Sequence, residues 1–145
     1  MTIARPFMGA FLLLSACVSG SPMPPVTDVG EVSMTWSGGI TGDVTSVTVH
    51  PDGQVETQVN TNPSTTSQMA ATDLTTLRAL VASSEFGELA PTYVPREGVC
   101  CDRFTYTVVA VVDDASRQSS TADGLDSPTI LTDVIQLLLT AAGGH

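Results

Sequence analysis

Lysine is absent from this chain of 145 residues, and five arginines face fifteen carboxylates, which gives a formal net charge of −10. No lysine is therefore available to reach a phosphate group, and no glycine-rich phosphate-binding loop opens a helix. A surface of this charge repels nucleic acid and anionic lipid head groups. We therefore expect no nucleic-acid partner.

Histidine is almost as scarce, since the chain contains only His50 and His145. A serine hydrolase needs a base beside its nucleophile, and neither histidine lies near a nucleophile-elbow sequence. His50 is expected to be a turn residue at the end of a strand. Two pairs of carboxylates fall at turn signatures, where acidic side chains commonly bond the local backbone: Asp113 with Asp114, and Asp123 with Asp126. We expect no enzymatic activity, no metal and no cofactor.

The first seventeen residues match the bacterial lipoprotein signal. Arg5 and the amino terminus supply positive charge, residues 7–14 form a short apolar run, and two small residues precede Cys17. Eight apolar residues are far fewer than the roughly 20 that cross a bilayer, so the run is an export signal. We expect residues 1–16 to be a signal peptide and Cys17 to be acylated as the first mature residue. An ordinary secretory signal that ends near a cysteine is the alternative.

Acylation of Cys17 predicts a location. Two or more acyl chains hold a protein stably on a membrane, whereas one chain does so only marginally. Val18 stands where an aspartate would indicate retention at the inner membrane, so we expect attachment to the outer membrane of a bacterial envelope. Residues 17–30, rich in proline and small side chains, read as a flexible tether that reaches up to about 45 Å.

The other two cysteines, Cys100 and Cys101, are adjacent in the sequence. Neighbouring Cα atoms lie about 3.8 Å apart, below the usual disulfide range, so a bond between them would be strained and reducible. A vicinal disulfide, an intermolecular bond and free thiols are the three possibilities, and the pair could act as a redox switch or be a rigid loop kink or an incidental pair. With the two histidines these sulfurs show no recognised metal-ligand spacing.

The apolar pattern over residues 31–142 predicts one α+β domain. Alternating apolar residues indicate strands, and Pro51-Asp52-Gly53 is typical of the turn of a hairpin over residues 43–60. Apolar residues at helical spacing indicate two helices, the first begun by Thr72 or Asp73 and the second by Ser127. We expect an antiparallel sheet of about four to five strands with both helices packed on one face. The expected strands are residues 31–36, 44–50, 55–59, 102–113 and 117–122, the expected helices are 72–86 and one after Pro128, and residues 60–67 are expected to be a loop.

Three segments, in order, resemble the emfourin family of proteinaceous inhibitors of thermolysin-like metalloproteases. They are the Ser-Gly-Gly-Ile-Thr-Gly run at 37–42, the helix at 74–86 that ends in Phe-Gly-Glu-Leu, and the Asp-Arg-Phe-Thr-Tyr strand opening at 102–106. A terminal helix with a leucine pair closes both patterns. The lipoprotein leader, the tether and the cysteine pair depart from the family pattern.

The resemblance implies an inhibitor that plugs a zinc protease cleft with a pre-shaped loop, because rigidity lowers the ordering cost of binding. Ile40 would enter the apolar S1′-type pocket of the protease; alternatively, Ile40 folds into the core of a plain turn. A non-catalytic envelope lipoprotein that binds another cell-surface component is the second functional hypothesis. The candidate partner-binding residues are Gly38, Gly39, Ile40, Thr41, Asp102 and Arg103.

Overall fold

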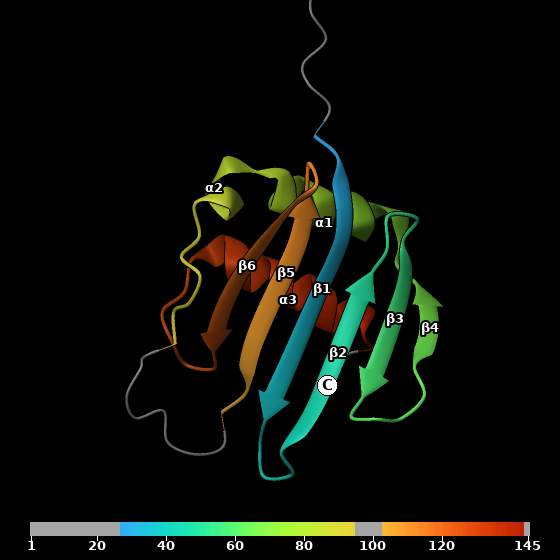
Figure 1. The fold of residues 1–145 in the computed structure, drawn as a ribbon, viewed down its shortest axis with the longest axis vertical. Helices are drawn as coiled ribbons and strands as arrows, with labels where there is room; N and C mark the ends of the chain where they lie inside the picture. The colour runs from blue at the N-terminus through green and yellow to red at the C-terminus, as the bar shows by residue number, and fades with distance from the viewer. Residues whose placement is uncertain (1–26, 95–102, 144–145) are drawn as a thin grey trace, which may run out of the picture.

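The computed structural model describes residues 27–94 and 103–143, which form one α+β unit (Figure 1). Cys17, Cys100, Cys101 and Asp102 lie outside the described residues, as does the signal peptide. None of the helices in the two described ranges combines the length and the hydropathy that a membrane span requires.

Six antiparallel strands and three helices make up the described residues, in place of the expected four to five strands and two helices. All five predicted strands are present, and one strand and one helix are additional. The elements are β1 (Val29–Gly38), β2 (Asp43–Val49), β3 (Gln54–Val59), β4 (Thr65–Gln68), α1 (Ala71–Ala82), α2 (Ser84–Gly87), β5 (Thr105–Val112), β6 (Ala115–Ala122) and α3 (Thr129–Ala141).

The sheet has the strand order β4-β3-β2-β1-β5-β6, so β1 lies between the hairpin β2–β3 and the hairpin β5–β6. The predicted hairpin over residues 43–60 is confirmed, because Thr45 pairs with Val59 and Val49 with Val55. Helices α1 and α3 both lie behind the sheet in Figure 1, which confirms that the long helices cover one face. The β1–β2 loop and the start of β5 lie together at one end of the sheet.

The core lies between the sheet and these two helices. Alternate side chains of β1, β2 and β5 point toward the helices, as period-two alternation requires. Helix α1 contributes Leu77 and Val81, and α3 contributes a broader apolar stripe, as predicted. The fully buried residues of this core include Met34, Val47, Val49, Val55, Leu77, Val81, Val108, Leu131, Val134 and Leu138.

Strand β4 was expected to be loop. Its four residues, Thr65–Gln68, are polar and all exposed, so no apolar alternation marks them in the sequence. Backbone pairing with β3 holds the strand, and the Gln68 side chain adds a 2.9 Å bond from Nε2 to the Asp52 carbonyl. The strand therefore depends on hydrogen bonds rather than on burial, which explains why the hydrophobic pattern misses it.

The helix expected over residues 72–86 is two helices. Ser83 takes an extended conformation, with ψ of 153°, and its hydroxyl accepts a bond from the Phe86 amide at the start of α2. The expected N-caps are also wrong. Helix α1 starts from Ala70 and α3 from Pro128, and neither start has a side-chain cap.

Hydrogen bonds from outside the strands protect one edge of the sheet and fix the start of β1. Strand β6 is an edge strand, as its polar composition predicts, but residues 91–93 cover part of it: the Tyr93 amide donates to the Ser120 carbonyl at 2.8 Å. Val29 and Gly30, expected in the tether, already belong to β1. The Asp28 amide donates to an Asp113 carboxylate oxygen at 2.9 Å, which fixes the start of β1 beside the β5–β6 turn.

Candidate functional site

The candidate loop connects β1 to β2 at an exposed end of the sheet. Gly38 pairs with Asp43, so only four residues, Gly39 to Gly42, make the connection. The Gly42 amide donates to the Gly39 carbonyl at 3.3 Å, which closes a turn. Ile40 lies within this turn and is 92% exposed. The alternative that Ile40 folds into the core is therefore wrong.

Two glycines let the base of the loop approach β5 closely. Gly38 has φ of +143°, and a Cβ placed on it would lie 2.1 Å from the Arg103 carbonyl oxygen. Gly39 has φ of +70°, and a Cβ there would lie 3.2 Å from the ring of Phe104. The backbone of β1 therefore touches the start of β5 at a place where no side chain fits.

A polar cluster braces the other side of the loop. Asn60, with φ of +53°, donates from Nδ2 to Asp43 Oδ1 at 2.7 Å and accepts from the Val44 amide at 2.9 Å. The hydrogen bond from Asn60, followed by one from Thr41, lowers the pKa of Asp43 below its ordinary value. The loop is thus tied to β2 and to the end of β3, which restricts its conformations before any partner arrives.

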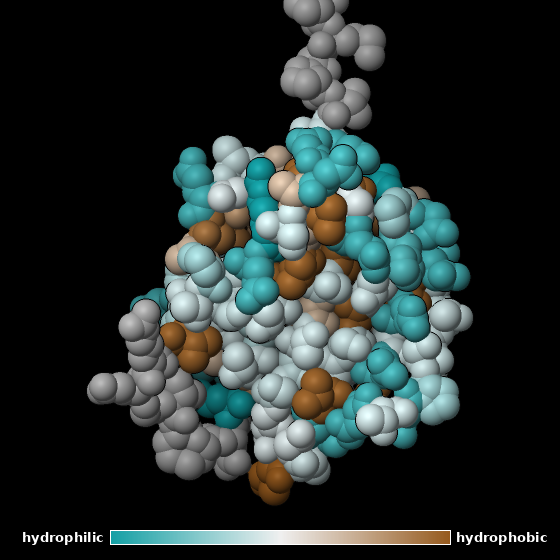
Figure 2. Space-filling model, in the orientation of Figure 1, coloured by the Kyte–Doolittle hydropathy of each residue, from teal (hydrophilic) through white to brown (hydrophobic). Residues whose placement is uncertain are grey.

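Exposed apolar side chains concentrate at this end of the sheet. Among the described residues, the exposed large hydrophobic side chains are Ile40, Val44 and Val59. Val44 is the second residue of β2 and Val59 is the last residue of β3, so both lie near the loop. Figure 2 shows a hydrophobic group protruding from the end of the molecule where Figure 1 places the β1–β2 connection.

Arg103, one of the predicted partner-binding residues, lies beside the base of the loop, and Phe104 lies next to it. The Arg103 side chain is exposed and makes no ion pair with any described residue. The Phe104 amide donates to Asp123 Oδ2 at 3.3 Å, and Asp123 also accepts a hydrogen bond from the Tyr106 hydroxyl. Burial, with the bond and the negative charge of Asp123, raises the pKa of Tyr106 to about 12. The structure therefore brings Gly38, Gly39 and Arg103 together at one end of the sheet.

The turn carboxylates bond distant backbone rather than the local backbone that was expected. Asp113 accepts from Asp28, 85 residues away, and Asp123 accepts from Phe104, 19 residues away. Their contacts join segments that meet only in the folded chain. The Asp113 contact fixes the start of β1, at the end of the sheet opposite to the loop. The Asp123 contact lies at the same end of the sheet as the loop.

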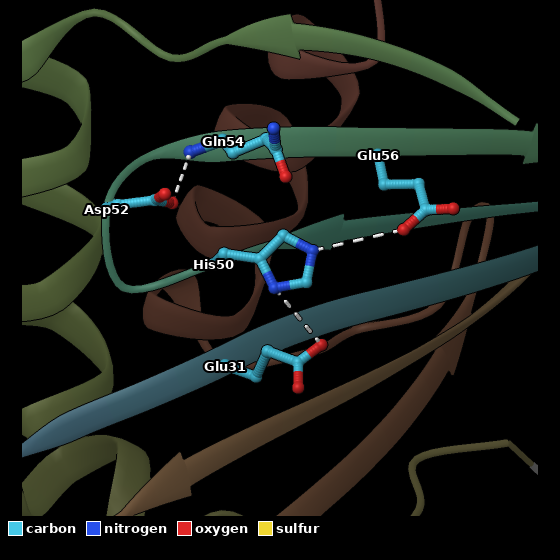
Figure 3. A network of polar contacts seen from close by, with 5 residues as sticks. All are labelled: Glu31, His50, Asp52, Gln54 and Glu56. Atoms are coloured by element: carbon cyan, nitrogen blue, oxygen red, sulfur yellow. Dashed lines mark hydrogen bonds and ion pairs between the residues drawn. The ribbon is translucent and has the colours of Figure 1, made fainter.

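His50 has partners that the sequence did not reveal. Its Nδ1 lies 3.7 Å from Glu31 Oε1 on β1, and its Nε2 lies 3.9 Å from Glu56 Oε2 on β3 (Figure 3). The adjacent Asp52 side chain accepts from the Gln54 amide at 3.0 Å and closes the β2–β3 turn. The two carboxylates face different ring nitrogens, so His50 lies between side chains of β1 and β3 at distances longer than a hydrogen bond. Within the described ranges, no group of three histidine, cysteine, aspartate or glutamate side chains is placed to hold a metal ion.

Sequence reasoning missed three members of the site, namely Asp43, Asn60 and Asp123 as a partner of Tyr106. Asp43 and Asn60 are 17 residues apart, and only the register of β2 against β3 brings them together. The hairpin signal at Pro51-Asp52-Gly53 sets that register, so counting outward from the turn places Asn60 opposite Val44, the neighbour of Asp43. Counting outward from the turn at Asp113-Asp114 likewise places Asp123 opposite Phe104, two residues from Tyr106.

Comparison with known protein families, with curated proteins and with solved structures finds no match to this chain.

Proposed function

We propose that this domain inhibits a thermolysin-like zinc metalloprotease by inserting the β1–β2 loop into its cleft. The resemblance of three segments to emfourins suggests the protease class. One structural observation carries the proposal: Ile40 is 92% exposed within a four-residue turn. An isoleucine so exposed contributes nothing to the core, whereas in an apolar pocket it would contribute about 2 kcal/mol.

The bracing of the loop supports the same proposal. A flexible loop would lose conformational entropy on binding, and the contacts from Asn60 and Arg103 limit that loss beforehand. Gly38 and Gly39 let the base of the loop lie directly against Arg103 and Phe104, so the loop is supported on the side facing β5. Ile40 would fill the S1′-type pocket while the neighbouring backbone lies across the cleft.

The test is inhibition of a thermolysin-like protease by the chain without residues 1–16, carrying Cys17→Ser so that no lipid is attached. We expect inhibition at micromolar protein or below. Ile40→Asp should weaken inhibition about 100-fold, because it buries a carboxylate in an apolar pocket. The matched control is Ser64→Asp, which adds the same charge in the exposed β3–β4 connection. Absence of inhibition, or equal effects of the two variants, would contradict the proposal.

We further propose that the protein is a lipoprotein anchored to the outer membrane through Cys17. Two or more acyl chains on this residue would hold the domain stably. An inhibitor of signal peptidase II should cause an unprocessed precursor to accumulate. Normal cleavage at another position, or recovery of unacylated protein from intact cells, would remove the anchor from the proposal.

The open face of the sheet favours a second candidate function, the binding of another cell-surface component. The helices cover only one face, and the opposite face carries exposed or half-exposed side chains such as Thr35, Thr48 and Val109. Val109→Glu should abolish capture of such a component and leave protease inhibition intact. Capture from envelope extracts that depends on Ile40 instead would favour the inhibitor.

A further inference from the structure

A cleft of about 150 Å³ opens between the β6–α3 connection and helix α3, at the same end of the sheet as the loop. A site needs about 10–15 Å³ of such space to hold one water, so the cleft has room for several waters or for one polar side-chain head. The residues that line it with polar atoms are Tyr106, Thr121, Asp123, Ser127, Thr132 and Gln136.

One lining residue, Thr121, has a buried hydroxyl group without a hydrogen-bond partner in the described part of the chain. Thr121 is only 4% exposed, and its hydroxyl oxygen has no hydrogen-bond partner among the described residues. A buried hydroxyl without a partner is costly, and such groups are uncommon in native structures. Rotation about the Cα–Cβ bond of Thr121 has to carry this buried oxygen toward the cleft before a ligand there can satisfy it.

The hydrogen-bonding capacity left in the cleft is mostly that of an acceptor. Asp123 accepts from Phe104 and Tyr106, and a carboxylate has about four acceptor positions, so about two remain. Ser127 and Thr132 share one contact of 3.4 Å between their hydroxyls and keep further lone pairs. The ligand that best uses the free carboxylate positions of Asp123 therefore carries several N–H or O–H donors.

Charge around the cleft selects a cation. Asp123 lines the cleft, and Asp126 and Asp133 are exposed and adjoin lining residues in the sequence. Two features oppose a cation. The Arg103 guanidinium carbon would lie 3.9 Å from a Cβ on Gly124, and the start of α3 carries roughly half a positive charge. Asp123 is the only charged residue among the described residues that line the cleft, so the charge inside the cleft is negative.

We propose that this cleft binds an arginine side chain of a partner protein. A guanidinium group is planar, presents five N–H donors and has no acceptor. It can pair with Asp123 through two N–H groups while a further N–H reaches the Thr121 hydroxyl. This inference stands on the cleft alone and does not require that the partner be a protease.

The test uses Nα-acetyl-argininamide and its neutral isostere Nα-acetyl-citrullinamide, each titrated by NMR into the acyl-free chain at low salt. The arginine probe is expected to bind with a dissociation constant of about 1 mM, as a ligand of this size allows, and at least tenfold more tightly than citrulline. Amide shifts should centre on residues 121–125 and 132–136. Equal affinities, or shifts elsewhere, would overturn the proposal.

Three variants separate the proposal from a purely structural role. Asp123→Asn should weaken the arginine probe at least tenfold, and Arg103→Ala should tighten it about twofold to threefold. Thr121→Val is the sharpest variant, because it removes an unpartnered hydroxyl and should raise the melting temperature while it weakens binding. Glu85→Gln, a loss of one exposed carboxylate on α2, is the matched control and should change neither. Unchanged binding in Thr121→Val, or preferred binding of Nα-acetyl-glutamate amide, would contradict the inference.

Discussion

The β1–β2 loop and the β2–β3 turn are both short connections between neighbouring strands of one sheet, yet they are built for different purposes. The β2–β3 turn is covered by the rest of the fold: Arg78 donates to the Pro51 carbonyl, and the Met69 amide donates to the Gly53 carbonyl. At the β1–β2 loop, a Cβ on Gly42 would meet nothing within 4 Å. The β2–β3 turn is therefore packed against other parts of the fold, whereas Gly42 of the β1–β2 loop is open, as the proposed insertion into a partner requires.

The largest predicted effect concerns the base of the loop. Gly38→Ala places a Cβ 2.1 Å from the Arg103 carbonyl oxygen at φ of +143°. Because a backbone atom must move, we expect a loss of about 3 kcal/mol in the free energy of unfolding. Urea denaturation checks this value through the midpoint. A loss below that of the next variant would show that β1 and β5 are not tightly joined there.

Gly53→Ala and Gly42→Ala form a matched pair that tests the comparison directly. Both positions have positive φ, +84° and +66°, so both variants carry the same backbone penalty. At Gly53 the added Cβ also meets Gln68 at 2.7 Å and Leu74 at 3.0 Å. We expect losses of about 2 kcal/mol at Gly53 and about 1 kcal/mol at Gly42. Equal urea midpoints would mean that the β2–β3 turn is no more constrained than the loop.

The smallest predicted loss of stability concerns the hydrogen bonds of Asn60 to Asp43 and Val44. Asn60→Gly, which tolerates the φ of +53° at this position, removes the bond to the Val44 amide at a cost of about 1 kcal/mol and should raise the pKa of Asp43 toward its ordinary value. A carboxyl with a lowered folded pKa stabilises the fold above its unfolded pKa, and this contribution is lost as the pH falls through the folded pKa. The variant should therefore lose less stability on acidification. NMR titration of the Asp43 carboxyl measures the shift, and Asn62→Gly serves as the control.

Much of the fold could be predicted because its signals are local and apolar. The alternation in β1 and β5, the Pro51-Asp52-Gly53 turn and the stripe on α3 each mark an element that burial stabilises. Strand β4 and the break at Ser83 depend on hydrogen bonds between polar residues, which leave no apolar pattern. Pattern reasoning is therefore weakest where polar contacts determine the backbone.

The candidate site could be predicted only in part. The glycines and Ile40 stand out in the sequence as a turn, but the sequence left the direction of Ile40 open. The brace by Asn60 and the pairing of Tyr106 with Asp123 depend on strand register across the sheet. These contacts join residues that are distant in the chain, so the apolar pattern does not reveal them, and they follow only when the hairpin registers are counted out from the turns.

Strand β1 places the start of the described domain and the β1–β2 loop at opposite ends of the sheet. The described chain enters the strand at Val29, beside the β5–β6 turn, and leaves it ten residues later at the opposite end, where the loop lies (Figure 1). Ten strand residues span about 33 Å. If a lipid holds the preceding segment to a membrane, the attachment lies at one end of β1 and Ile40 at the other, so the loop is presented at the end of the domain remote from the anchor.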